Sequence, residues 1–176
     1  MSLLIKMSTF LKEFEFEKAP LKMKYLDAEP LKLNSEFIFF HNKSKFRKEL
    51  TRLQYLFKSY TKVALHAAGI RDSYLKQEYS DKFFVILFTI PEMVKKVNDF
   101  IETHSDMELK PSCFYLETTS DFILLLSRDM EGLSLGIGTM ELILKQVLDD
   151  YINQNRYDDY IKIRPFEILN CGNSPV

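Results

Sequence analysis

Tryptophan is absent from this sequence, and cysteine, glycine and proline are scarce: 2 Cys, 5 Gly and 6 Pro among 176 residues. So few glycines and prolines exclude a collagen-like repeat or a low-complexity chain, and two cysteines exclude a disulfide-stapled miniprotein. No run of apolar residues approaches the ~18 that a membrane-spanning helix needs, so we expect no membrane partner. The opening residues 1–6 lack the pattern of a signal peptide, so the compartment is left unknown, with the cytoplasm as the default expectation.

Hydrophobic residues are plentiful by contrast, at 46% of the chain, with 15 Phe and 9 Tyr. A chain of this length and composition fits one packed domain without help from metals or disulfides. It contains no repeat and no internal linker rich in Gly or Ser. We therefore expect a single α+β domain over residues 21–170, an N-terminal arm or edge strand over residues 1–20, and a flexible end over residues 171–176.

Charge is spread unevenly along the chain, since the first 62 residues carry 13 Lys/Arg against 7 Asp/Glu although the net charge is −1. Many of these cations lie at residues 43–58, where they would form the solvated face of a helix. The isoelectric point of about 6.3 is below the ~9 typical of nucleic-acid-binding domains, so we expect no nucleic-acid partner.

The three histidines and two cysteines lack the spacing of a metal site, so we expect no metal and no other cofactor. Buried or free thiols are the expectation for Cys113 and Cys171. Sequence alone leaves open whether the two pair.

Hydrophobic periodicity predicts the elements of the fold. Helices are expected from about residue 44 to 60, over residues 91–104 and over residues 131–152. A continuous apolar run at residues 82–90 predicts a central strand buried on both faces. Further strand-like runs lie at residues 21–26, 36–40, 63–65, 113–118, 121–127 and 160–169. This order predicts an α+β fold, a mostly antiparallel sheet with two or three helices packed on one face.

The start of the last long helix carries three glycines, Gly132, Gly136 and Gly138. A glycine inside a helix costs about 1 kcal/mol relative to alanine, so three of them within seven residues indicate a geometric reason. The segment lacks the lysine of a P-loop, and its glycine order does not fit the dinucleotide fingerprint. We therefore expect the glycines to bring the helix close to a strand or a neighbouring helix, without a bound nucleotide.

The same helix has apolar residues on two sides. At 100° per residue most of them form one broad face, whereas Leu135 and Leu142 fall on the opposite side. A second apolar line is typical of a helix that lies between two layers. Leu135 and Leu142 are therefore the candidate partner-facing residues.

The hairpin and the helix after it resemble a known domain. A strand that opens Tyr115-Leu116 pairs with a second strand, and the helix then reads G-L-x-x-G-x-x-T-M over residues 132–140. This is similar to the small non-catalytic domain that precedes the catalytic barrel in β-N-acetylhexosaminidases and related glycoside hydrolases of families 20 and 84. The resemblance implies an antiparallel sheet covering two helices whose far face docks on the barrel. The helix-packing motif would consist of Gly132, Gly136, Gly138, Thr139 and Met140.

No catalytic constellation is apparent in this chain. The catalytic acid pair of the resembled family belongs to the barrel, so no residue here inherits that role. The adjacent acidic pairs Asp149-Asp150 and Asp158-Asp159 are expected on the solvated surface, and no Ser/His/Asp or Cys/His set has a local signature.

We therefore expect a non-catalytic accessory domain that packs on a catalytic domain or on a second copy of itself, as a homodimer. The alternative is an independent α/β-sandwich module, ferredoxin-like in form, that binds or regulates. An enzyme of unrecognised type is a third hypothesis.

Overall fold

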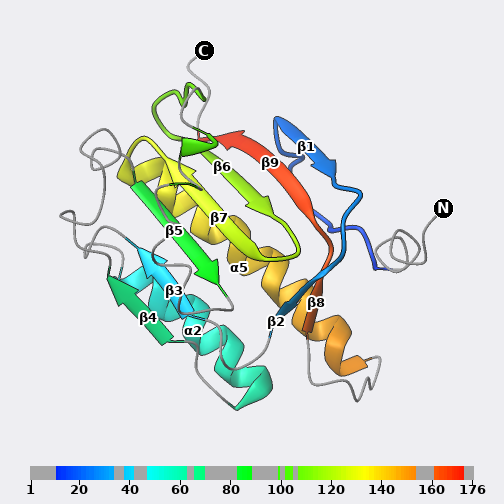
Figure 1. The fold of residues 1–176 in the computed structure, drawn as a ribbon. Helices are drawn as coiled ribbons and strands as arrows, with labels where there is room; N and C mark the ends of the chain where they lie inside the picture. The colour runs from blue at the N-terminus through cyan, green and yellow to red at the C-terminus, as the bar shows by residue number, and fades with distance from the viewer. Residues whose placement is uncertain are drawn as a thin grey trace.

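The computed structural model describes residues 11–33, 38–41, 47–62, 66–69, 83–88, 99, 102–104, 107–153 and 161–172. It has two layers, a large sheet and two helices that both lie on one face of it (Figure 1). The strand order in the large sheet is β1-β9-β6-β7-β5-β3-β4, and β2 and β8 form a separate two-stranded sheet. The expected α+β class, with a mostly antiparallel sheet covered by helices, is confirmed.

The strands of the large sheet are short and all neighbours are antiparallel except β3 and β4. Helix α2 spans Arg47–Thr61 and helix α5 spans Met130–Asn153. The small sheet pairs β2 (Leu31–Leu33) with β8 (Ile161–Ile163). The large sheet contains β1 (Lys22–Tyr25), β3 (Ile38–His41), β4 (His66–Gly69), β5 (Phe83–Phe88), β6 (Cys113–Thr118), β7 (Phe122–Ser127) and β9 (Phe166–Cys171).

The two helices make different crossovers. Helix α5 lies between β7 and β9 in the chain, and both of these strands pair antiparallel with β6 between them, which makes a split β-α-β unit. Helix α2 instead joins β3 and β4, which are direct parallel neighbours. Only one of the two crossovers therefore has the split form of a ferredoxin-like domain.

The core lies between the helices and the sheet. The buried face of α5 follows the expected helical spacing, and α2 contributes a second stripe of buried residues. Each of these side chains stabilises the fold by roughly 1.5–3 kcal/mol through removal of apolar surface from water. The buried residues of the two helices are Leu50, Leu53, Phe57, Leu133, Ile137, Met140, Ile143, Leu144 and Leu148.

Residues 160–169, expected as one strand, form parts of two. β8 ends at Ile163 and pairs with β2, whereas β9 begins at Phe166 and joins the large sheet. The break falls at Pro165, because a proline has no N–H to continue a ladder. The carbonyl of Pro165 accepts a hydrogen bond from the amide of Leu26 at 2.9 Å instead.

Two other expected elements lie outside the described residues. The brief strand at residues 63–65 is one of them, and the described strand β4 begins just after it, at His66. Most of the helix expected over residues 91–104 is the other. The hairpin is confirmed, with β6 and β7 joined by a three-residue connection at residues 119–121.

Cys113 and Cys171 form a disulfide, so the expectation of free thiols is wrong. The two cysteines face each other directly across the antiparallel pair β6 and β9, and this register could not be read from a separation of 58 residues. Beside the bond, the amide of Gly172 donates to the carbonyl of Ser112 at 2.8 Å. Cys171 is the last residue of β9, whereas residues 173–176 of the expected flexible end lie outside the described residues.

The described part of the N-terminal segment, residues 11–20, contains no strand and lies against α5 as an arm. The ring of Phe14 packs edge-on against Phe166, with ring centroids 5.3 Å apart. The backbone of Glu15 exchanges two hydrogen bonds with the side-chain amide of Gln146, at 2.8 and 2.9 Å. Of the two forms expected for residues 1–20, the described residues take that of the arm.

Candidate functional site

Two of the three glycines at the start of α5 face the sheet. A Cβ on Gly132 would overlap the carbonyl oxygen of Cys113 and the hydroxyl of Ser127. A Cβ on Gly136 would overlap the side chain of Leu125. At these two positions a side chain would push α5 away from β6 and β7.

The other residues of the proposed packing motif lie differently. A Cβ on Gly138 would meet nothing within 4 Å, and this residue is exposed. The hydroxyl of Thr139 donates to the carbonyl of Leu135, one turn earlier on the same helix, at 3.1 Å. Met140 is buried in the core. The close approach of α5 to the sheet therefore involves Gly132 and Gly136, and the inclusion of Gly138 in a packing motif is corrected.

Asp129 caps α5 and ties it to the loop before β6. One carboxylate oxygen accepts from the amide of Gly132, and the other accepts from the amide of Ser112, both at 2.8 Å. A side-chain oxygen at this position satisfies an amide that the helix itself leaves unpaired. The Gly132 amide, which a bound phosphate would use, is thus already hydrogen-bonded within the chain.

The opposite side of α5 carries the two leucines singled out from the sequence. The side chain of Leu135 also lies close to Gly172, the residue that follows β9. Leu135 and Leu142 are each 39% exposed, and the exposed Gly138 lies between them. On the neighbouring helix α2, Tyr55 is 67% exposed. The term outer helix face is used below for the solvent side of α2 and α5, with these four residues as its apolar part.

The two helices run side by side in the same direction. A guanidinium nitrogen of Arg52 lies 2.6 Å from a carboxylate oxygen of Glu141, and the Tyr60 hydroxyl donates to the carboxylate of Asp149. Both links join residues 89 positions apart in the chain, so the helices are parallel and level with each other.

The charges of the two helices are opposite. Within α2 there are four cationic residues and one anionic residue, and within α5 one cationic and four anionic residues. The α2 residues are Arg47, Lys48, Arg52, Lys58 and Glu49, and those of α5 are Lys145, Glu131, Glu141, Asp149 and Asp150.

A polar cluster that sequence analysis missed lies on the other face of the sheet. A ring nitrogen of His104 lies 2.7 Å from a carboxylate oxygen of Glu117, and the rings of His104 and Tyr115 pack at a tilt of 44°, with their centroids 5.1 Å apart. Glu117 on β6 is directly opposite Glu167 on β9, whose carboxylate is 3.3 Å from the ammonium of Lys24. Tyr115 and Glu117 are two residues apart on β6, so they lie on the same face of the sheet. Their contact with Glu167 depends on the register of β6 with β9, which the sequence does not show.

Each of the two carboxylates in this cluster has a partner. Two carboxylates directly opposite each other would repel, but Lys24 and His104 each lie against one of them. Burial, and then the nearby carboxylates of Glu117 and Glu167, raise the pKa of Tyr115 far above its usual value, so its hydroxyl keeps its proton and donates hydrogen bonds to these carboxylates. The arrangement braces β6 and β9 against each other and holds His104 on the sheet.

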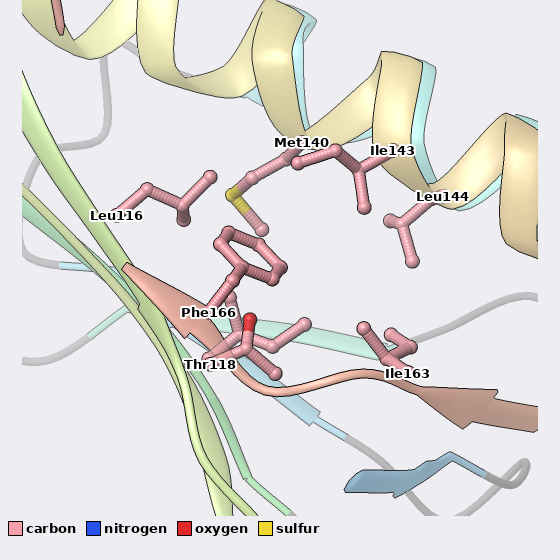
Figure 2. Close-up of a pocket in the computed structure, with 8 residues that line it drawn as sticks. Leu116, Thr118, Met140, Ile143, Leu144, Ile163 and Phe166 are labelled. Carbon is pink, nitrogen blue, oxygen red and sulfur yellow. The ribbon is translucent and has the colours of Figure 1, made fainter. Parts of the chain in front are cut away.

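A small cavity lies between α5 and the sheet (Figure 2). Met140, Ile143 and Leu144 enter it from the helix, and Phe166 and Thr118 enter it from the sheet side. Its volume of about 10 Å³ is at the lower limit for a single water molecule. The hydroxyl of Thr118 is fully buried and has no hydrogen-bond partner among the described residues.

Compared with known proteins, the chain matches no family model, no curated protein and no solved structure. Neither helix described here is long and apolar enough to cross a membrane. Within the described residues, no group of three or more His, Cys, Asp or Glu side chains is arranged to hold a metal ion.

Proposed function

We propose that this chain is a non-catalytic module that acts by protein association through the outer helix face. The observation that carries the proposal is the exposure of Leu135 and Leu142 on the side of α5 that faces away from the sheet. Helices that cover a sheet normally turn polar residues to solvent, so an apolar line on the outer side favours a further layer. The small internal cavity is almost entirely apolar, which does not favour recognition of a polar ligand there.

We further propose that the partner layer belongs to a carbohydrate-active enzyme, as an accessory domain would require. Support comes from the layer arrangement, because the resemblance to the hexosaminidase accessory domain implies an antiparallel sheet covering two helices that dock by their far face. The sheet and the two helices have that arrangement (Figure 1). The partner would then be the catalytic barrel.

The first test is the sequence of the gene downstream of this chain. The reading frame should continue into a catalytic barrel, and if it does not, the proposal of a carbohydrate-active enzyme is withdrawn. In the resulting two-domain protein, Leu135→Glu with Leu142→Glu should uncouple the domains, seen as two separate thermal transitions and faster proteolysis between them. Leu21→Glu is the matched control, because Leu21 is 62% exposed at the sheet edge. Equal behaviour of the two variants would contradict docking through α5.

The second candidate is an independent binding module, and the specific observation that favours it is the polar cluster of Tyr115, Glu117 and Glu167. A ligand at this cluster would be cationic, since it would compete with Lys24 for a carboxylate. Titration with an arginine-rich peptide tests this, with Glu167→Gln expected to weaken binding. Saturable binding that the variant does not change would argue against the cluster.

A further inference from the structure

We infer that the outer helix face is self-complementary and binds a second copy of this chain. In this dimer, α2 of one protomer lies on α5 of the other, about a two-fold axis parallel to the helices. The inference rests on the first part of the proposed function, that the outer helix face is an association surface. It names a second copy as the occupant of that face in the free chain, and a barrel docked there would take its place.

Register is the first argument. Arg52 is level with Glu141 and Tyr60 is level with Asp149, so each residue of α2 lies level with the α5 residue 89 positions later. A rotation about a two-fold axis parallel to both helices does not shift any residue along the helix direction. Residue 55 of one copy therefore lies level with residue 144 of the other.

Charge is the second argument. Helix α2 carries a net charge of +3 and would face α5 of the second copy, whose net charge is −3, and the symmetry makes this contact twice. Glu141 and Asp150 already pair within each protomer, with Arg52 and Lys12, so the contact depends on the net charges and on Asp149. Lys58 comes level with residue 147 of the second copy, between Lys145 and Asp149. Opposite charges across a contact set its register and speed its formation.

The same charges disfavour the other face-to-face arrangement. A two-fold axis perpendicular to the helices would place α2 on α2 and α5 on α5. The two α2 helices, each of net charge +3, would then oppose each other, and so would the two α5 helices, each of net charge −3. Juxtaposed like charges select against a wrong partner or a wrong orientation.

An apolar contact lies at the centre of the arrangement. Tyr55 is the most exposed large apolar side chain in the described residues, at 67%. It comes level with the segment of the second copy just after Leu142, which is also exposed. A tyrosine seated on a leucine side chain is typical of the central contacts that hold protein interfaces together, since it buries a large ring with little loss of side-chain freedom.

Sedimentation velocity on the purified chain tests the dimer, from about 5 µM to about 500 µM. We expect a monomer–dimer equilibrium that weakens when salt rises from about 50 mM to about 500 mM, because the charges at its rim are screened. Leu142→Glu or Tyr55→Glu should weaken the dimer at least about tenfold, whereas Leu21→Glu should leave it unchanged. A wild-type monomer over the whole range would overturn the inference.

Charge reversal tests which helices meet. Variant A carries Lys58→Glu on α2, and variant B carries Asp149→Lys on α5. Alone, each places like charges across both contacts and should be monomeric, with circular dichroism confirming the fold. Mixed, A and B should form a one-to-one dimer, because both contacts then join opposite charges. If the mixture stays monomeric, or if A alone dimerises as well as wild type, the pairing of α2 with α5 is wrong.

A control variant, Lys22→Glu, makes the same change of charge on β1, outside the helix layer, and should dimerise normally. The inference and the proposed function fail separately. A chain that stays monomeric but docks on a barrel through Leu135 and Leu142 would overturn only the inference. A dimer abolished by Leu142→Glu, with no barrel in the reading frame, would leave the inference standing without the carbohydrate-enzyme partner.

Discussion

Gly132 of α5 lies so close to the carbonyl oxygen of Cys113 that a methyl group on its Cα would overlap that oxygen. Cys113 is the first residue of β6, so the backbone of the strand limits how near the helix can come. We expect Gly132→Ala to lower the free energy of unfolding by about 1–3 kcal/mol, because the overlap outweighs the better helix propensity of alanine. Urea denaturation followed by circular dichroism measures the change.

Gly138→Ala is the matched control on the same helix. Nothing lies within 4 Å of the added methyl group, so only helix propensity changes, and stability should rise by about 0.5–1 kcal/mol. The two substitutions are identical in chemistry and should have opposite signs. Loss of stability at both positions would contradict the placement of Gly138 away from the sheet.

This pair of glycines shows how far the sequence predicts the helix. The cost of glycine in a helix predicts that something must lie near Gly132, Gly136 and Gly138, but not on which side of the helix. Gly132 and Gly136 are four residues apart, so they lie on the same side of the helix and both face the sheet. Gly138 lies on the other side and points outward. Local patterns therefore predict the helix and its buried stripe, and tertiary contacts decide the role of each glycine.

Long-range register is what the sequence leaves out. The disulfide and the polar cluster both depend on the pairing of β6 with β9, whose partners are about fifty residues apart in the chain. Alternation within β6 places Tyr115 and Glu117 on one face, but only the register adds Glu167. No local signal in the sequence specifies that register, because strands distant in the chain pair through the topology of the whole sheet.

Reduction of the Cys113–Cys171 disulfide should destabilise the fold by about 3–4 kcal/mol. The bond closes a loop with a sequence separation of 58, and a cross-link over such a span restricts the unfolded chain substantially. Urea denaturation with and without a phosphine reductant measures the difference.

The double variant Cys113→Ala with Cys171→Ala is the control for this prediction. It should have the stability of the reduced wild type and should not respond to reductant. Two titratable thiols in the unreduced, denatured wild type would contradict the disulfide.

Thr118→Val should stabilise the protein by about 1 kcal/mol. Valine has nearly the shape of threonine, and the Thr118 hydroxyl is buried in a cavity lined by Met140 and Phe166, with no hydrogen-bond partner in the part of the chain that the structure describes (Figure 2). Removal of a buried polar atom that makes no hydrogen bond removes a desolvation cost. Thermal and urea unfolding measure it. Thr139→Val is the control, because the Thr139 hydroxyl is half-buried on α5 and hydrogen-bonded to Leu135, so its loss should not stabilise the protein. A loss of stability at Thr118 would show that its hydroxyl bonds a trapped water molecule.

Alkaline solution should destabilise the fold through Tyr115. Burial is the main reason that its pKa is raised above 10.0 in the folded chain, and the carboxylates of Glu117 and Glu167 add to the effect. Below pH 10 the phenol is protonated in both the folded and the unfolded state, so its contribution to stability is fully present. Above pH 10 the unfolded chain loses this proton while the folded chain keeps it, so stability falls by about 1.4 kcal/mol per pH unit for this one group.

Absorbance at the phenolate band and urea unfolding between pH 9 and about pH 11.5 together test this mechanism. In wild type, one tyrosine should ionise only as the chain unfolds, which gives a late step in the phenolate absorbance. Tyr115→Phe should lack this late step, and its free energy of unfolding should fall less steeply with pH. Glu167→Gln removes one of the carboxylates that raise the pKa of Tyr115, so the late step should move to lower pH. An unchanged step in Glu167→Gln would contradict the hydrogen-bonded cluster, because the phenol would then not respond to the carboxylate across the strand pair.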